Sequence, residues 1–223
     1  MWRFIRLMDA MRVEITSIKA ENAPKVYRIA LSDGRLFSIK TAYLKEDFIS
    51  CVALCSISLA STPFEISEDK DAELRFACAC LRTERAALSL IANAEQTCLG
   101  LEYKLKARGH TSSCVKAVVD HLSSIEAVND ERYAGLWVQS RLSLKSDSPN
   151  KLLAKLCAKG IPCGTAKKVL KAALDVETEL ALVKKFAAKN LIDSESSRTR
   201  RQRLKYEGFS AEVVQTLEEE ERG

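Results

Sequence analysis

The sequence predicts a mainly α-helical protein, built as a tandem array of three three-helix repeats and preceded by a small N-terminal β-hairpin or three-stranded sheet. Only eight of the 223 residues are glycine and four are proline, too few for the many turns of a β-sandwich or barrel. From about residue 72 onward, apolar residues recur with helical periodicity. A pattern of basic residue, leucine, three residues and glycine also occurs three times at nearly equal spacing, which is typical of a repeat protein.

The three patterns end at Gly109, Gly160 and Gly208, which lie 51 and 48 residues apart. Each glycine ends an apolar-periodic stretch, as expected of a glycine that terminates a helix in the left-handed conformation. A helix-start residue follows each one: Thr111, Pro162 and Ser210. After the first glycine, the next helix carries an amphipathic stripe at the i, i+3, i+4, i+7 spacing. The stripe consists of Val115, Val118, Val119 and Leu122.

These signals divide the chain into an N-terminal region, residues 1–71, and repeats at 72–128, 129–174 and 175–223, the last ending in an acidic tail. The second repeat is the clearest. Its first helix is predicted from Asp130 to Leu144, with acidic residues in the first turn where the helix dipole favours them. Its second helix is predicted to begin with Ser148 as N-cap and Pro149 as first residue.

Two β-prone runs mark the N-terminal region, Val26–Leu31 and Leu36–Ile39. The Asp33-Gly34 dipeptide between them favours a type I′ turn, which would pair Leu31 with Leu36 and Ala30 with Phe37. Val13, Ile15 and Ile18 could supply a third strand. The segment from residue 41 to 63 is ambiguous, because its apolar run is compatible with a helix but is mixed with β-branched residues and serines, which disfavour one.

Nothing in the sequence indicates a secreted or membrane protein. Charged residues interrupt the first nine positions, so no signal peptide is apparent, and Met11 is an alternative start. The apolar run from Phe48 to Ala60 is shorter than the ~20 residues that span a bilayer. The eight cysteines form no C-x-x-C pair and are interpreted as reduced, mostly core residues. We therefore expect a cytoplasmic protein without a metal.

Catalytic patterns are missing from the sequence. It contains no phosphate-binding glycine loop, no H-E-x-x-H and no G-x-S-x-G. Only two histidines occur, His110 and His121, and His110 stands where the other repeats have apolar residues. We therefore expect a non-enzymatic protein without a cofactor.

Charge is distributed unevenly along a chain whose net charge is +5. From Glu131 to Ala211 there are 17 lysines and arginines against 8 aspartates and glutamates, an excess of 9, before the acidic run Glu218–Glu221. Such a surface suits a polyanion or an acidic protein groove, although many solvated helices are equally basic. The candidate contact residues are Lys151, Lys155, Lys159, Lys167, Lys168, Arg198, Arg200, Arg201, Arg203 and Lys205.

The arginines of this set are the denser group. Aligning the repeats on their glycines places Arg200 where the other two have Leu101 and Leu152. Arginine binds phosphates and carboxylates bidentately, so the cluster is a candidate for contact with DNA or an acidic groove. A second pattern, on the first helix of repeat two, is interpreted as a packing motif rather than a ligand site. It consists of Asp130, Tyr133, Ala134, Trp137 and Arg141.

These patterns together resemble the RecX family. The similarity covers about residues 72–220 and is carried by the following segments: Arg85–Ile91, Leu101–Leu105 with Gly109, Asp130–Ala134 with Trp137 and Arg141, Leu152–Ile161, and Tyr206–Ser210. The chain departs from the family pattern at Glu95–Cys98, where a basic, serine-containing approach is usual. It also lacks a glycine often found at Asp147–Pro149.

The resemblance implies an elongated, curved array that lies in the groove of the filament formed by RecA on DNA. It also implies a regulator that mostly inhibits the recombinase, ATPase and co-protease activities of RecA, acts as a monomer and needs no cofactor. Direct contact with single- or double-stranded DNA is a further expectation. The main alternative is a stand-alone helical DNA-binding regulator, whose affinity for duplex would fall steeply with salt. A scaffold repeat without a nucleic-acid role is a third, and an enzyme comes last.

Overall fold

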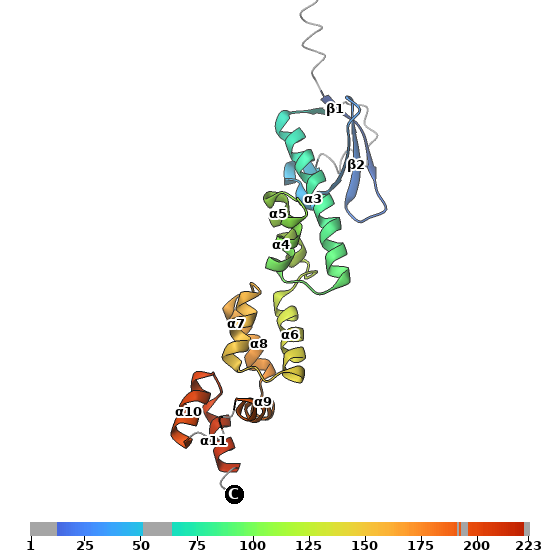
Figure 1. Cartoon of the computed structure of the whole chain (residues 1–223). Helices are drawn as coiled ribbons and strands as arrows, with labels where there is room; N and C mark the ends of the chain where they lie inside the picture. The colour runs from blue at the N-terminus through green and yellow to red at the C-terminus, as the bar shows by residue number, and fades with distance from the viewer. Residues whose placement is uncertain (1–12, 51–63, 191, 193–195, 221–223) are drawn as a thin grey trace, which may run out of the picture. The chain divides into compact units, whose positions relative to one another are not determined.

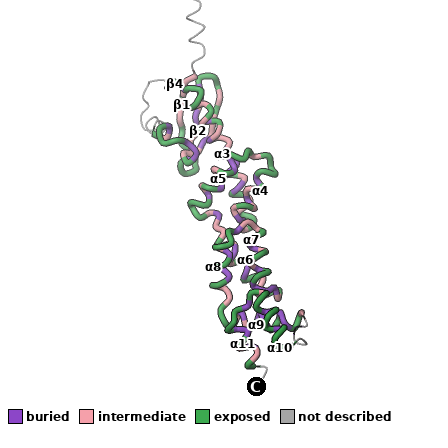
Figure 2. Tube along the Cα trace, turned by 90° about the vertical axis from the view of Figure 1, so that its left-hand side faces the viewer, coloured by how far each residue is buried: buried purple, intermediate pink, exposed green. Residues whose placement is uncertain are grey.

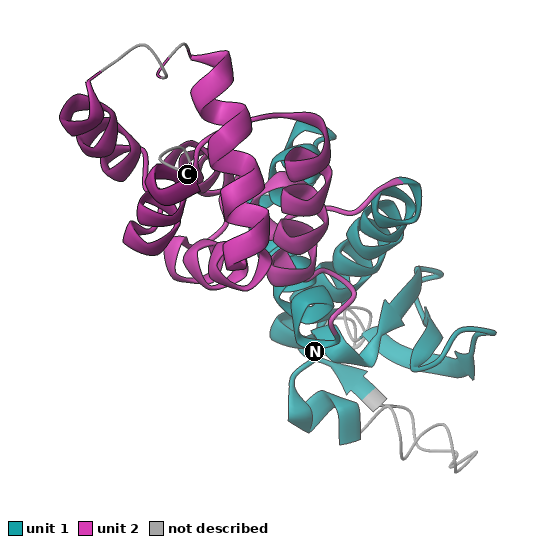
Figure 3. Ribbon diagram, turned by 90° about the horizontal axis from the view of Figure 1, so that it is seen from below, with its two compact units in different colours: residues 1–93, 102–125 teal, residues 94–101, 126–223 magenta. Residues whose placement is uncertain are grey.

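The computed structural model describes residues 13–50, 64–190, 192 and 196–220. They form two compact units, residues 1–93 with 102–125 and residues 94–101 with 126–223 (Figure 3). Each unit is described by itself. The predictions about the first nine residues, about Met11 and about the apolar run beyond Ser50 lie outside the described residues.

Unit 1 contains an antiparallel sheet of four strands in the order β3-β2-β1-β4; its two central strands, β2 and β1, are labelled in Figure 1. The strands are β1 (Val13–Ala20), β2 (Val26–Leu31), β3 (Leu36–Lys40) and β4 (Phe64–Ile66). The first three were predicted, with β1 as the third strand. The fourth was not, because three residues beside an ambiguous segment carry too little alternation to identify a strand.

The register of the predicted hairpin is wrong by one residue. Ala30 pairs with Leu36 and Ile29 with Phe37. The turn is not type I′ but a three-residue loop, in which the Gly34 N–H donates to the Leu31 carbonyl at 3.0 Å and the Leu31 N–H donates to the Arg35 carbonyl at 2.9 Å. Gly34 has φ +85° whereas Asp33 keeps a negative φ. One left-handed residue after a tight turn adds a bulge, and the bulge shifts the pairing.

A long helix, α3 (Glu68–Asn93), packs on the sheet and begins four residues before the predicted start of the first repeat. Ile29 and Ile39 of the sheet are fully buried, as are Leu74 and Ala77 of the helix. A single turn of 3-10 helix, η2 (Thr41–Tyr43), follows β3. The sheet and the start of the helical array therefore share one hydrophobic core.

Two shorter helices complete the first three-helix set, α4 (Cys98–Ala107) and α5 (Ser112–Ser124). Residues 98–101 of α4 belong to unit 2 and the rest of the helix to unit 1. The predicted stripe on α5 is confirmed, since Val115, Val118, Val119 and Leu122 are each at most 3% exposed. This stripe faces α3.

Unit 2 holds the second and third helix sets. The second consists of α6 (Asp130–Leu144), α7 (Pro149–Ala158) and α8 (Cys163–Ala173); the third consists of α9 (Val176–Lys189), α10 (Ser197–Tyr206) and α11 (Ala211–Glu220). The predicted bounds of α6 and the Ser148-Pro149 start of α7 are confirmed. The mainly helical fold is thus as predicted, while the repeat boundaries themselves stay a prediction.

Each set has its own apolar core, visible as buried stretches along every helix of unit 2 (Figure 2). In the second set Ala134, Val138, Leu156 and Ala166 are completely buried. In the third set Val183, Ile192, Leu204 and Val213 have the same role. Every helix therefore contributes one apolar face to a core and leaves its polar face outside.

The three repeat glycines have φ values of 85°, 85° and 91°, as expected of helix-terminating residues. Within unit 2, two of them also form a repeated joint between second helices. A Cβ on Gly160 would come within 2.5 Å of Leu99 Cβ, and one on Gly208 within 2.5 Å of Asn150 Oδ1. Leu99 and Asn150 both stand ten residues before the glycine of their own repeat. The end of one second helix therefore lies against the start of the preceding one.

Hydrogen bonds complete both joints. At the first, the Thr97 hydroxyl donates to the Lys159 carbonyl at 3.2 Å. At the second, the Asn150 N–H donates to the Glu207 carbonyl at 3.0 Å and Ser148 Oγ donates to the Glu207 carboxylate at 2.5 Å. Polar groups at the helix ends are thus satisfied by the neighbouring repeat instead of by water.

The structure corrects one expectation about the cysteines. Cys157 and Cys163 form a disulfide, whereas all cysteines were expected to be reduced. The turn between α7 and α8 brings their Cα atoms to 5.6 Å, within the usual range for a disulfide. Cys78, Cys80 and Cys114 are free thiols. Within the described residues, no helix combines the length and the apolar composition needed to cross a bilayer.

We predict that Gly160→Ala lowers the unfolding free energy of the protein by about 2–5 kcal/mol. A left-handed backbone costs an alanine about 1–2 kcal/mol, and the collision with Leu99 adds about 1–3 kcal/mol of overpacking. Urea unfolding followed by circular dichroism measures the loss. Gly164→Ala, four residues away in α8, is the control. That site has open space and no positive φ, so the alanine should stabilise the helix by up to about 1 kcal/mol. Equal effects of the two variants would contradict the joint.

Candidate functional site

The buried titratable residues of unit 1 form a structural network. The carboxylate of Glu84 accepts from Lys40 Nζ at 2.5 Å and from the Tyr43 hydroxyl at 2.8 Å. Burial, reinforced by Glu84, raises the pKa of Tyr43. Thr83 Oγ1 lies 2.9 Å from His110 Nδ1. These hydrogen bonds tie α3 to η2, to β3 and to the turn after α4 within unit 1.

No group of three or more metal-ligating side chains comes together anywhere in the described part of the chain. The candidate site is therefore a surface, and the basic residues of unit 2 are its components. Their usefulness for binding depends on whether each cation is already paired.

The lysines of α7 are largely engaged. Asp147, which is 5% exposed, binds both Lys151 at 3.2 Å and Lys155 through charge-assisted hydrogen bonds. Burial acts to raise the pKa of Asp147, but the bonds from Lys155 and Lys151 outweigh it and hold that pKa below its usual value. A partner would have to compete with this carboxylate for two of the predicted contacts.

Lys159 belongs to an aromatic cluster on α6. Its Nζ lies 5.8 Å from the ring centre of Tyr133 and 5.9 Å from that of Trp137. On the same helix, the Arg141 guanidinium stacks 5.1 Å above Trp137. The half-buried Arg141 therefore packs its charged group on an indole ring. Cation–π contacts of this kind are worth about 0.5–1 kcal/mol at exposed sites.

The remaining packing-motif residues hold helices together. Ala134 is fully buried in the core of the second set. Asp130 accepts the Cys98 N–H at 2.8 Å, so it caps the start of α4 while it begins α6. Its neighbour Glu131 lies 2.8 Å from Lys168 Nζ, and that pair occupies another predicted contact. Lys167, one residue earlier, is exposed and has no ion pair among the described residues.

On α10 the predicted arginine cluster separates into different environments. Arg200 is 8% exposed and turns toward the core, because its position in the repeat is the inward position held by Leu101 and Leu152. It is therefore corrected from a contact residue to a buried one. Arg198, Arg203 and Lys205 are exposed. Arg198 also stands ten residues before Gly208, the position at which Leu99 and Asn150 meet a following repeat.

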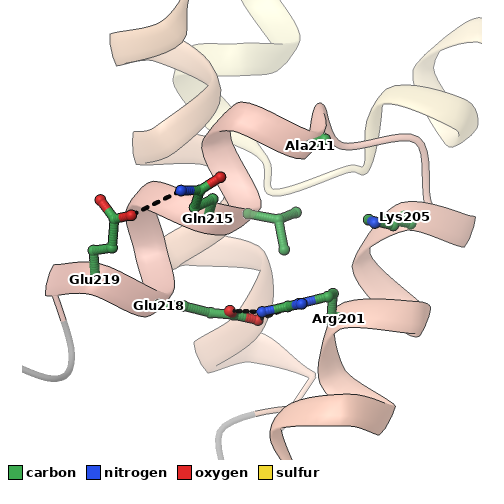
Figure 4. Close-up of a pocket in the computed structure, with 7 residues that line it drawn as sticks. Arg201, Lys205, Ala211, Gln215, Glu218 and Glu219 are labelled. Atoms are coloured by element: carbon green, nitrogen blue, oxygen red, sulfur yellow. Dashed lines mark hydrogen bonds and ion pairs between the residues drawn. The ribbon is translucent and has the colours of Figure 1, made fainter.

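Arg201 is tied to the acidic tail. Its Nε lies 2.9 Å from Glu218 Oε1 on α11, and a second nitrogen binds the other carboxylate oxygen (Figure 4). Hydrogen bonding and charge attraction from Glu218 raise the pKa of Arg201. Arg201 and Glu218 line a pocket between α10 and α11 (Figure 4). Lys205 lines it as well, and it has no acidic partner of its own in the described residues.

Sequence reasoning missed Lys185 and Lys189 on α9. Both are exposed, and neither has an ion pair within the described residues. Their spacing of four residues places them on one helix face, and that spacing was the available signal. Glu177 and Glu179 on the same helix make α9 nearly neutral overall, so a count of its charge does not reveal the pair.

We predict that Asp147→Asn costs about 1–3 kcal/mol of unfolding free energy at neutral pH, the usual worth of hydrogen bonds to a charged group. Because the folded-state pKa is depressed, this stabilisation is present above the unfolded value of ~3.9 and is lost as pH falls through the folded value. Urea unfolding of both proteins from neutral pH to about pH 3 should show the difference shrinking. Asp120→Asn, at an exposed aspartate of α5, is the control. If the difference in unfolding free energy between the wild type and Asp147→Asn stays constant with pH, the ion pairs of Asp147 with Lys151 and Lys155 are excluded.

Comparison with known proteins places this geometry in a family. The family model described as the second three-helix domain of RecX matches residues 129–170. The regulatory protein RecX of Treponema pallidum is 31% identical over 86 residues, which is 39% of this chain and 52% of that protein. The chain thus spans about half the length of this relative. The regulatory protein RecX of Halorhodospira halophila is 30% identical over 146 residues, 62% of this chain and 90% of that protein.

Two solved structures share the fold. A crystal structure of a regulatory protein RecX superposes with a TM-score of 0.63 at 20% identity, covering 93% of this chain and 99% of the other. A crystal structure of RecX from Lactobacillus salivarius gives 0.51 at 23% identity, with 64% and 96% covered. With the same helical fold and a relative matched over nine tenths of its length, the chain belongs to the RecX family of regulatory proteins.

Proposed function

We propose that the chain binds the filament formed by RecA on DNA and modulates the recombinase, mostly by inhibiting its ATPase, strand-exchange and co-protease activities. The relatives are named as regulatory proteins. The observation that carries the proposal is a set of exposed cations in unit 2 that no described acid neutralises. A protein of this kind acts by binding, with no cofactor. The proposed setting is the cytoplasm and the proposed state a monomer.

The pairing of each cation ranks the contact residues. Lys167, Arg198 and Lys205 are exposed and free of ion pairs in the described residues, so they can meet an acidic groove or a phosphate at no cost in internal contacts. Arg203 is exposed as well. The five others that remain exposed or half-buried have partners to give up first: Lys151, Lys155, Lys159, Lys168 and Arg201. Breaking each of these internal contacts costs free energy, which offsets part of what the new contact with the partner contributes.

The test is the rate of ATP hydrolysis by the cognate RecA on single-stranded DNA as the protein is titrated in. We expect the hydrolysis rate to fall at ratios well below one copy of the protein per RecA monomer, because one bound modulator can interrupt a cooperative filament. An unchanged rate, with filaments verified by electron microscopy, would exclude filament modulation. Tight duplex binding in the absence of RecA would then favour a stand-alone DNA-binding regulator.

Reversing the three free cations should weaken this effect. We predict that the triple variant Lys167→Glu, Arg198→Glu, Lys205→Glu requires at least about tenfold more protein for half-maximal inhibition, since each like-charge contact at an interface costs on the order of 1 kcal/mol or more. The same titration at two salt concentrations should show a weaker salt dependence. The control is Lys116→Glu on α5, an exposed lysine outside the set. If the triple variant inhibits like the wild type, these residues do not contact the filament.

A further inference from the structure

A second cationic feature of unit 2 lies where the end of α6 and the loop after it meet α9. It is a pocket of about 460 Å³, here called the lysine pocket. Its lining residues are Ser143, Leu144, Lys145, Ser146, Lys185 and Lys189. None of the ten predicted contact residues lines it, so it is a site separate from the surface considered above.

Rigid elements hold the pocket. Lys185 and Lys189 lie one turn apart on α9, whose opposite face buries Val183, Phe186 and Ala187 in the core of the third set. Lys145 is the C-cap of α6, where its N–H donates to the Arg141 carbonyl at 2.8 Å. The two ends of the pocket therefore come from different helix sets, and the fold brings three ammonium groups to one hollow.

No described carboxylate neutralises these three lysines. None of them has an ion pair among the described residues, and no acidic residue lines the pocket. The nearby described acids are occupied: Asp147 binds Lys151 and Lys155, and Glu220 binds Lys184 at 2.5 Å. Three like charges around one hollow repel one another. A bound anion would remove this repulsion.

The donors in the pocket fit phosphate. Each ammonium offers three hydrogen-bond donors, and the Ser146 hydroxyl has no partner within the described residues. Lysines around a hollow act as separate point charges that can surround a tetrahedral group, whereas a planar carboxylate is better matched by an arginine fork. No arginine lines the pocket.

The volume and the wall point to an extended ligand. One phosphate fills only a small part of 460 Å³. Leu144 lines the pocket with 78% of its surface exposed, which adds an apolar wall beside the cations. A nucleic acid strand presents charged phosphates next to apolar sugar and base surfaces, so it matches both components. We propose that the lysine pocket binds the phosphodiester backbone of DNA; this deepens the proposed function, and rests on it for the choice of DNA among phosphate-bearing ligands.

The test measures DNA binding by the full chain in the absence of any recombinase. A fluorescein-labelled oligothymidylate is titrated with protein, and anisotropy gives the affinity across roughly 50–200 mM salt. In the triple variant Lys145→Ala, Lys185→Ala, Lys189→Ala we expect at least about tenfold weaker binding. The slope of log affinity against log salt should become shallower by about 2, because each lost phosphate contact removes about 0.7 from a single-strand slope.

A charge-matched control separates the pocket from net charge. The triple variant Lys106→Ala, Lys116→Ala, Lys184→Ala removes three lysines outside the pocket, two of them paired with Glu102 and Glu220. It should keep nearly wild-type affinity and slope. Equal losses in the two triple variants, or no DNA binding by the wild type, would overturn the assignment. Urea unfolding midpoints check that both variants fold, and a Lys→Gln version of the pocket triple replaces any that does not.

Two competitors identify the chemistry. Oligothymidylate with uncharged methylphosphonate links should bind the wild type weakly, and the pocket variant should lose little further affinity on that substitution. The second competitor is polyglutamate. If it displaces the labelled DNA as effectively as unlabelled oligothymidylate does, the pocket binds acidic partners in general and the phosphate assignment is overturned. The RecA titration is scored separately. If the pocket variant loses DNA binding but still inhibits RecA, the assignment of the lysine pocket stands. If the wild-type protein does not inhibit RecA, only the proposed function is excluded.

Discussion

The arrangement of unit 2 depends on the close approach of consecutive second helices at a glycine. Gly160 receives Leu99, and Gly208 receives Asn150, in the same geometry. A left-handed backbone and the absence of a Cβ are both required there, because the carbon would lie within 2.5 Å of its neighbour. Hydrogen bonds from Thr97 and Asn150 then satisfy the helix ends. Within unit 2, the two joints therefore form at equivalent positions of successive repeats, as expected for repeats that contact only their neighbours.

The same joints decide which charges are available to a partner. Lys159, the C-cap of α7, lies beside Tyr133 and Trp137 of α6 instead of extending freely into solvent. Asp147, buried next to the start of α7, draws in Lys151 and Lys155. A surface that is uniformly basic in the sequence thus becomes a few free cations separated by neutralised ones. The proposed interface and the lysine pocket both consist of cations that these internal contacts leave unpaired.

Several sequence predictions failed for local physical reasons. The bulge at Gly34 shifted the hairpin register by one residue, since a two-residue and a three-residue turn share the same Asp-Gly signal. β4 was too short to show alternation. The pairing of Cys157 with Cys163 depends on how a turn folds back. Arg200 was assigned to the surface because arginine rarely lies inside, although its helical position faces the core.

By itself the sequence determined the helix periodicity, the left-handed glycines at 109, 160 and 208, the bounds of α6, the N-cap of α7, and the family resemblance. These features depend on residues within a few positions of one another, so local geometry is sufficient. Only the tertiary structure decided which lysines are paired and that Lys145 meets Lys185 and Lys189. Ion pairs and pockets join residues tens of positions apart, and a one-dimensional charge pattern does not contain those distances.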